Sequence, residues 1–227
     1  MSQSVVAVIE FLATDDAHIM SSSMKRLLSF LALLGLLGSA HAEVETYKID
    51  PVHSSIGFSL RHILSKFTSS FTKVTGELTV DRDNLEKSSV TASIDVAALN
   101  TDNEGRDKHI KSPDFFDVAK FPTAAFKSKS WKKTGESTFD ITGDLTIKDV
   151  TKEVVLKANL LGFGPGMRPG AFLSGWEATA TIKKSDFNLA GPAMLSKALG
   201  DDVALTINLE AGYKKEQPAA AAPAKQG

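Results

Sequence analysis

The sequence predicts an all-β fold of eight or nine antiparallel strands with one short helical insert. The main sign is alternation of apolar and polar residues, which puts one face of a strand in a core and the other in water. Val203, Leu205 and Ile207 face one side, for example, and Thr206 and Asn208 the other. The same alternation recurs in the segments 56–60, 90–96, 139–147 and 178–182.

Further extended runs and turn signals complete the strand pattern. Strands this closely spaced, with few helices between them, pair as an antiparallel meander, and this many strands close into a barrel or fold into a sandwich. Gly57 and Gly143 lie inside strand patterns and are natural places for a sheet to bend into a barrel. The additional strands are expected at 44–49, 72–80, 124–131 and 153–161, with turns at 81–84, 133–135 and 148–149.

The helical insert is expected within 100–128, where ionic, aromatic and turn-forming residues interrupt the strands. Asp102 or Asn103 can cap a short helix that runs through Ile110. Ser112 and Pro113 are typical of the start of a second helical turn, after which the chain returns to extended form. We expect this insert to lie over the edge or mouth of the sheet.

The N-terminal region indicates export. Residues 24–42 begin with Lys25 and Arg26, continue with an apolar run of about eleven residues, and end in an A-x-A motif at Ala42. The apolar run is shorter than the roughly twenty residues of a membrane span, so we expect a cleaved signal peptide, a periplasmic product and no stable membrane insertion. Residues 1–23 are expected to be a mis-assigned start.

The length and composition of the remaining chain predict a single exported domain at 43–213. A disordered tail that contains Pro, Ala and Lys is expected to follow at 214–227. The chain has no cysteine, which excludes a disulfide framework, a thiol nucleophile and a lipoprotein anchor. The formal net charge is −1 and the basic residues are scattered among acidic ones, so nucleic-acid binding is not expected.

Four motifs, taken in order, resemble the YceI family of bacterial periplasmic lipid-binding proteins. The motifs are YKIDPVHSSIGFSLRH at 47–62, NTDNEGRDKHIKSPDFFDVAKFP at 100–122, GDLTIKDVTKEVVL at 143–156 and LGDDVALTINLEA at 199–211. The resemblance implies an elongated, eight-stranded, lipocalin-like barrel. It also implies an apolar tunnel for a polyisoprenoid or similar long-chain amphiphile, with no known enzymatic chemistry.

Three positions depart from the family pattern or are particular to this chain. Asp149 stands where the family commonly has glycine, and Asn188 follows Phe187 where a Phe-Gly step is common. Asparagine tolerates left-handed backbone, so the second change is mild. The Gly- and Pro-rich loop at 162–172 leaves a role at the tunnel mouth or in gating open.

The apolar strand faces supply the candidate tunnel residues. An eight-stranded barrel has an interior that side chains can fill or that holds one small ligand, and small residues such as alanine leave room for the latter. The sequence does not separate residues that touch a ligand from residues of a packed core. The candidates are Ile56, Phe58, Leu60, Leu78, Ala92, Ile94, Phe139, Ile141, Leu156, Ala180, Leu205 and Ile207.

The chemistry-capable residues are His53, beside Ser54, with His62, Arg106, Asp107 and His109. A metal site is not expected, because His53 and His62 would lie on opposite faces of one strand. A serine hydrolase is not expected either, since adjacent strand residues point apart and no G-x-S-x-G elbow occurs.

Two interpretations of this polar cluster remain open. In one, Arg106 and Asp107 form ion pairs and hydrogen bonds that pin the helical insert to the barrel. In the other, Arg106 and the histidines hold the polar head of an amphiphile at the tunnel mouth. We predict no catalytic residue and no cofactor.

The favoured function is a periplasmic carrier of an isoprenoid or other long-chain lipid. The alternative is a secreted structural or interaction domain with a packed core and no lipid ligand. A hydrolase acting on lipid-linked substrates is less favoured, and a homodimer is left open.

Overall fold

The computed structural model describes residues 44–195 and 197–214. The expected start at 1–23, the expected signal peptide at 24–42 and residues 215–227 of the expected tail lie outside these residues. Lys214, which the expected tail included, is the last residue of a strand. No helix in the described part of the chain is long and apolar enough to cross a membrane. The strands are β1 (Glu45–Ile49), β2 (Ser55–His62), β3 (Ser65–Phe71), β4 (Val74–Val80), β5 (Ser89–Asp95), β6 (Thr123–Lys133), β7 (Thr138–Ile147), β8 (Val150–Pro165), β9 (Ala171–Lys183) and β10 (Leu199–Lys214).

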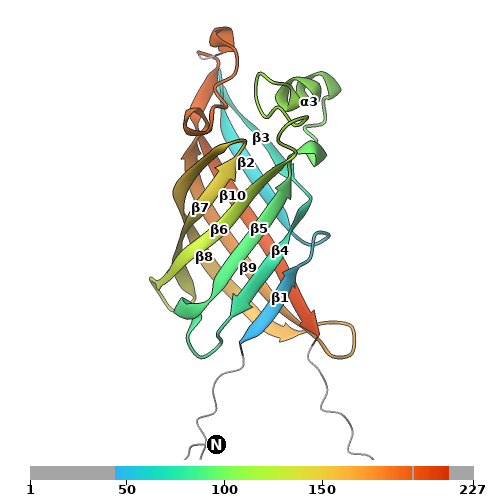
Figure 1. Cartoon of the computed structure of the whole chain (residues 1–227), viewed down its shortest axis with the longest axis vertical. Coiled ribbons are helices and arrows are strands. Elements are labelled where there is room, and N and C mark those ends of the chain that lie inside the picture. Colours follow the sequence, from blue (N-terminus) through green and yellow to red (C-terminus); the bar gives the residue numbers. More distant parts are fainter. Residues whose placement is uncertain (1–43, 196, 215–227) are drawn as a thin grey trace, which may run out of the picture. The chain divides into compact units, whose positions relative to one another are not determined.

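These strands form a closed antiparallel barrel (Figure 1). The order is β1-β4-β5-β6-β7-β8-β9-β10-β2-β3, and a further pairing of β1 with β10 closes the ring. β1 and β2 pair with different parts of β10 and so share one position in the wall. β4 pairs with β1 and β3 pairs with β2, so β3 and β4 share the next position. The prediction of an eight-stranded barrel is therefore confirmed.

The wall is incomplete on one side near the end that carries α3 (Glu104–Lys111) (Figure 1). β4 pairs with β5 from Val74 opposite Ile94, whereas β3 pairs with β2. In the described chain, one isolated backbone bridge, between Ser70 and Asn100, joins β3 to the other side, and side-chain contacts accompany it. The segment between β5 and β6 fills the space beside β3. It contains α3 and the 3-10 helix η3 (Val96–Ala98).

The two glycines expected to bend the sheet behave differently. Gly143 lies opposite a register shift between Ser128 and Ser130 of β6. A Cβ at this glycine would come within 2.5 Å of the Phe126 ring and 2.6 Å of the Lys127 carbonyl oxygen. At Gly57 the register with β3 and β10 is uninterrupted, so no bulge marks the expected bend.

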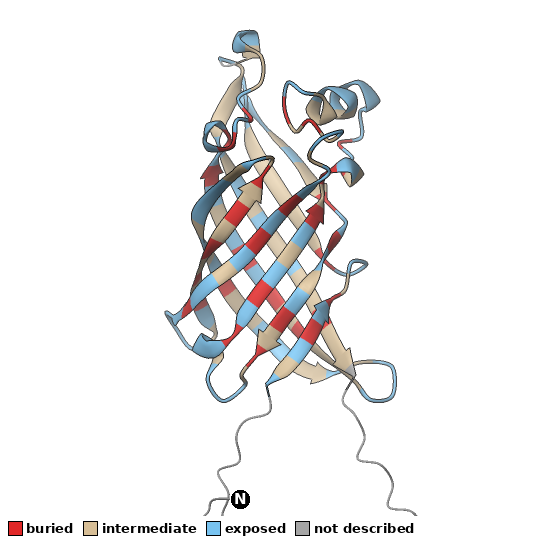
Figure 2. Cartoon of the chain, viewed as in Figure 1, coloured by how far each residue is buried: buried red, intermediate tan, exposed pale blue. Residues whose placement is uncertain are grey.

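Alternation decides which residues face inward, as Figure 2 shows in the red and pale bands along the strands. In β7, Phe139, Ile141, Leu145 and Ile147 are buried while the residues between them are more exposed. The inward side chains form one apolar core from both halves of the barrel. The predicted strand period is thus confirmed.

The connections differ from expectation in detail. α3 is capped by Asn103, whose side chain accepts the Arg106 N–H, and it ends at Lys111. The second helical turn expected at Ser112 and Pro113 is a hydrogen-bonded turn instead. β3 was not expected, because its Ser-rich sequence carries few apolar residues. Two further 3-10 helices, η4 (Lys184–Phe187) and η5 (Ala193–Leu195), connect β9 to β10, and Asn188 after η4 has left-handed backbone with φ 56°.

Candidate ligand cavity and its mouth

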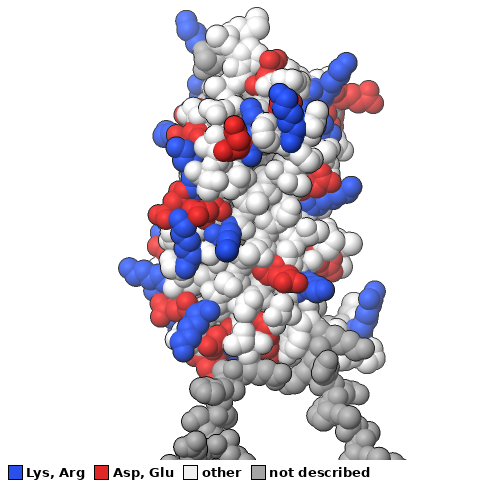
Figure 3. Space-filling view, in the orientation of Figure 1, with Lys and Arg blue, Asp and Glu red and all other residues white. Residues whose placement is uncertain are grey.

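An apolar cavity of about 770 Å³ occupies the barrel interior. Its walls come from the inward faces of the strands, and α3 and the loop before β10 border its mouth. The volume lies within the usual range of small-molecule sites. The charged groups of the barrel side seen in Figure 3 are of both signs and intermixed, so they form no single-sign surface there.

Most of the candidate tunnel residues border this cavity. Phe139 and Ala180 are the exceptions: Phe139 packs under the cavity against Trp131 and Trp176, and Ala180 is half-buried beside Leu205. Contact with a ligand stays a prediction for all of them. The candidates that line the cavity are Ile56, Phe58, Leu60, Leu78, Ala92, Ile94, Ile141, Leu156, Leu205 and Ile207.

Aromatic side chains close the end of the barrel away from α3. Trp131 and Trp176 both line the cavity and meet edge to face, with ring centroids 5.3 Å apart. Phe163 continues the layer, 6.2 Å from Trp176 and 6.0 Å from Tyr47. Both indole N–H groups are buried without a hydrogen-bond acceptor in the described chain.

The loop at 162–172 lies at this closed end. Phe163 and Phe172 flank the guanidinium of Arg82, which is 4.9 Å and 5.1 Å from the two ring centroids. Phe172 also packs against Tyr213. The loop therefore belongs to the floor of the barrel, away from the mouth.

Arg106 connects the insert to the open side of the barrel. Its guanidinium donates hydrogen bonds to the Thr101 hydroxyl and carbonyl and lies 4.5 Å over the ring of Phe67 in β3. Asp107 accepts hydrogen bonds from the backbone and hydroxyl of the same Thr101, which lower the pKa of its carboxyl group. Arg106 lines the cavity, whereas Asp107 does not.

Two of the candidate histidines also border the mouth. His62 ends β2 and lines the cavity there. His109 of α3 lines it from the other side, where its ring contacts Phe115 and its Nε2 lies 3.0 Å from a carboxylate oxygen of Asp114. Both rings are largely exposed, so they are accessible to a ligand head group.

Lys184 is a mouth residue that the sequence analysis missed. It is 9% exposed and lines the cavity, with its ammonium 3.4 Å from the Ala190 carbonyl oxygen and 3.8 Å from a carboxylate oxygen of Asp201. The adjacent Lys183 faces outward and pairs with Asp202. The two consecutive lysines at the end of β9 were the sequence signal for an inward-facing lysine, because neighbouring residues at the end of a strand point to opposite faces.

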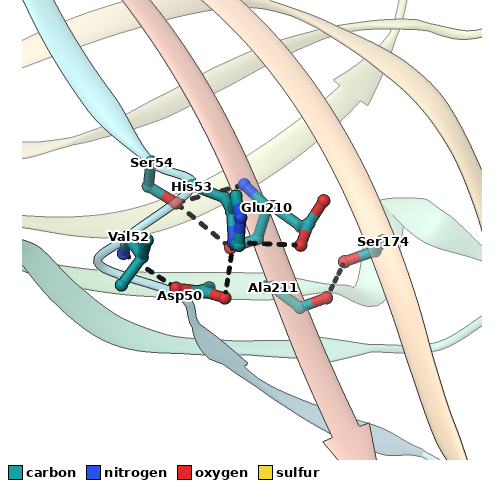
Figure 4. A network of polar contacts seen from close by, with 7 residues as sticks. All are labelled: Asp50, Val52, His53, Ser54, Ser174, Glu210 and Ala211. Atoms are coloured by element: carbon teal, nitrogen blue, oxygen red, sulfur yellow. Dashed lines mark hydrogen bonds and ion pairs between the residues drawn. The ribbon is translucent and has the colours of Figure 1, made fainter. Parts of the chain in front are cut away.

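His53 does not join the mouth group. It lies in the connection between β1 and β2, where Nδ1 is 2.9 Å from an Asp50 oxygen and 3.7 Å from a Glu210 oxygen (Figure 4). Hydrogen bonding to Asp50 raises the pKa of His53, and the same contact lowers the pKa of Asp50. His53 is not among the cavity-lining residues, so its expected role at the mouth has no support from its position.

The groups around His53 bear on the two chemistries weighed for it. The side chains of Asp50, His53 and Glu210 each place one possible metal-ligand atom within 4.8 Å of the other two. This spacing is compatible with a bound metal ion and equally with ion pairs alone. Ser54 is buried, and its hydroxyl donates to the Glu210 carbonyl oxygen and accepts from the Glu210 N–H. The hydroxyl therefore takes the place of a backbone hydrogen-bonding partner beside β10. The expectation of no metal stays a prediction.

Several other cavity residues were missed because they come from segments without clean alternation. Phe67 and Phe71 belong to the unexpected strand β3, and Phe58 packs against both rings. The insert, the loop before β10 and the start of β10 supply others. These further lining residues include Ile110, Phe115, Phe116, Leu189, Leu195 and Leu199.

A closed antiparallel barrel with an apolar interior and polar groups around one mouth defines a lipocalin-like binding barrel. The YceI-like domain model matches residues 47–211, and the chain belongs to this family. A UPF0312 protein of Pseudomonas savastanoi is 38% identical over 184 residues, covering 79% of this chain and 95% of its own.

Solved structures agree with this assignment. The YceI protein of Campylobacter jejuni is 31% identical with a TM-score of 0.60, over 67% of this chain and 88% of its own. A domain from Saccharophagus degradans, described as polyisoprenoid-binding, shares the fold at 16% identity with a TM-score of 0.56, over 74% of this chain and 98% of its own.

Proposed function

We propose that this protein is a periplasmic carrier that holds a polyisoprenoid or similar long-chain amphiphile in the barrel. The hydrocarbon chain lies along the apolar cavity toward Trp131 and Trp176. The polar head stays at the mouth, near α3. The protein binds this ligand and does not transform it.

The observation that carries the proposal is the apolar cavity. A well-packed core contains few voids larger than a water molecule, whereas this interior leaves about 770 Å³ between apolar side chains. Filling it with hydrocarbon contributes about 0.8 kcal/mol for each methylene removed from water. A long chain is therefore favoured over a short one.

The mouth favours a head group with hydrogen-bond acceptors. Arg106, Lys184, His62 and His109 border the same end of the cavity and all can donate hydrogen bonds. A hydroxyl, carbonyl or phosphate oxygen would find donors there and would avoid burial without partners. A cationic head group would find fewer partners, since Asp107 is bound to Thr101 and does not line the cavity.

Two further observations support the proposal. The sequence of residues 24–42 is typical of a secretory signal, which supports the periplasmic location. The shared fold with the Saccharophagus degradans domain supports a lipid as the class of ligand. The absence of catalysis is supported by the position of Ser54, whose hydroxyl is engaged by the backbone of Glu210.

Mass spectrometry of an organic extract tests the proposal. The protein is purified after expression with its natural leader, and an unrelated periplasmic protein is extracted in parallel. We expect one long-chain species in near-stoichiometric amount that is missing from the parallel extract. A clean extract that stays clean after incubation with isoprenoid lipids would instead favour the interaction domain.

A further inference from the structure

The hairpin between β2 and β3 has an unusual tip. His62 pairs with Ser65, so Ile63 and Leu64 form a two-residue loop. Such loops favour Asn-Gly and similar sequences, because at least one position needs positive φ. Here Ile63 has φ 52°, which is a strained conformation for a β-branched residue. Ile63 is 53% exposed and Leu64 98% exposed, so burial within this chain does not explain either side chain.

The strained tip is held by specific contacts. The Ile63 N–H donates to the Ala198 carbonyl at 2.7 Å, and the Arg61 guanidinium donates to the Ile63 carbonyl at 2.8 Å. Ala198 belongs to the same connection as η5, which carries Met194 with 84% exposure. We call Ile63, Leu64 and Met194 the mouth tip. These three exposed apolar side chains stand on two segments that the hydrogen bond from Ile63 to Ala198 joins.

The two segments that carry the mouth tip contain basic residues and no acidic ones. Residues 61–66 contain Arg61, His62 and Lys66, residues 190–199 contain Lys197, and neither stretch contains Asp or Glu. The nearest acidic pair along the chain, Asp201 and Asp202, already contacts Lys184 and Lys183. Basic side chains that flank exposed apolar ones are typical of surfaces that bind anionic lipid.

The mouth tip is continuous with the cavity. His62, Lys66, Leu195 and Leu199, which flank the tip on both segments, line the cavity itself. In Figure 1 the hairpin and the loop before β10 rise at the same end of the barrel as α3. The uppermost part of the molecule in Figure 3 is mainly white, with a basic group at its left edge and an acidic group to the right.

We propose that the mouth tip docks on the surface of an anionic phospholipid bilayer. Ile63, Leu64 and Met194 enter between the head groups, while the flanking basic residues contact phosphates. The isolated tips suit a bilayer better than a protein partner, because a stable protein interface needs about 800 Å² on each side. The benefit to a carrier, which rests on the proposed function, is that the amphiphile passes between bilayer and cavity without crossing water.

Flotation with vesicles tests the docking surface. The probe is vesicles of phosphatidylglycerol and phosphatidylcholine in equal parts, compared with phosphatidylcholine alone. We expect the protein to float with the anionic vesicles only. The double variant Ile63→Gly/Leu64→Asn should lose about tenfold or more in affinity, since burial of one large apolar side chain alone accounts for that factor.

The same double variant separates docking from folding. Glycine at position 63 suits a two-residue loop whose first residue has positive φ and relieves the strain at Ile63, so the melting temperature should be unchanged or higher while binding falls. Met194→Ser should lower binding without touching the hairpin. Met167→Ser is the matched control, because Met167 is fully exposed beside Arg168 in the loop at the opposite end and should keep full binding.

Three results would overturn the docking surface. They are failure of the unaltered protein to float with anionic vesicles, equal flotation of the double variant, and an equal loss with Met167→Ser. Equal binding to phosphatidylcholine alone would overturn the anionic preference. A lipid-loaded extract without flotation would refute docking alone, and flotation with a clean extract would refute the carrier alone.

Discussion

The guanidinium of Arg106 lies 4.5 Å over the ring of Phe67, so a cation–π contact joins α3 to β3. This contact spans the part of the wall where, in the described chain, β3 meets the β5 side through one backbone bridge, from Ser70 to Asn100, and a hydrogen bond from the Ser69 hydroxyl to the Asn100 carbonyl oxygen. Arg106 also holds Thr101 through two hydrogen bonds. The insert is therefore fixed to the barrel at its mouth by a residue that also lines the cavity.

Arg106→Ala should weaken both the attachment of the insert and the hold on a ligand head. An exposed cation–π contact is worth about 0.5–1 kcal/mol, which corresponds to a fall in melting temperature of roughly 1–4 °C for a domain of this size. Affinity for an amphiphile with an anionic head should fall more than affinity for its neutral analogue. Thermal melts and paired ligand titrations measure the two effects.

Phe67→Leu provides the comparison for Arg106→Ala. It removes the ring under the guanidinium but leaves the donors of Arg106 in place. A similar small loss of stability with little discrimination between charged and neutral heads is expected. If Arg106→Ala instead abolished folding, its role would be structural and the head-group assignment would lose its support.

Filling the cavity should abolish ligand binding without unfolding the barrel. Ala92 lines the cavity from β5, and a tryptophan there would occupy space that a hydrocarbon chain needs. Ala92→Trp should therefore lose binding in a fluorescent-lipid displacement assay while keeping the strand signal in circular dichroism. Ala204→Trp is the matched control, because Ala204 is exposed on β10 and should bind normally. Unchanged binding by Ala92→Trp would place the ligand elsewhere.

Gly143 and Gly57 should respond oppositely to alanine. The added Cβ at Gly143 would meet the Phe126 ring and the Lys127 carbonyl oxygen at 2.5 Å and 2.6 Å, so we expect a loss of roughly 1–3 kcal/mol in the free energy of unfolding. At Gly57 the nearest atom is 3.5 Å away, and alanine should leave stability unchanged or raise it. Chemical denaturation of the two variants measures the difference, and equal effects would contradict the local geometry.

The contact of His53 with Asp50 should make stability depend on pH. The pKa of His53 is raised in the folded protein, so its contribution is fully present below the unfolded value near 6.5 and is lost as pH rises through the folded value. His53→Gln should thus reduce the melting temperature relative to the unaltered protein at low pH and have less effect above the folded pKa. The reverse pattern would show that the ring is held neutral.

The contribution of Asp50 to stability has the opposite pH dependence to that of His53 and changes at lower pH. Its pKa is lowered by hydrogen bonds from His53 and from the Val52 N–H. The stabilisation it provides is present above the unfolded value near 3.8 and disappears as pH falls through the folded value. His53→Gln should therefore be compared with the unaltered protein at pH values well above this range.

The sequence predicted the barrel better than it predicted the mouth. Period-two alternation placed Ile141 and Leu205 on the inner face, because a strand in a closed barrel has one dry side. The mouth is built from irregular segments brought together by closure, so the contact between Arg106 and Phe67 has no local signal. His53 was expected at the mouth, but the break between β1 and β2 directs it toward Glu210 in β10.

Binding of isoprenyl alcohols of increasing chain length tests the central claim most directly. The assay is displacement of a fluorescent lipid at equal free concentrations of each alcohol. We predict that affinity rises by up to about 0.8 kcal/mol for each added buried methylene until the cavity is full, and then levels off. Ala204→Trp should show the same rise and plateau, whereas Ala92→Trp should bind none of the alcohols. Affinity that is absent, or that does not depend on chain length, would contradict an apolar cavity that holds a long-chain ligand.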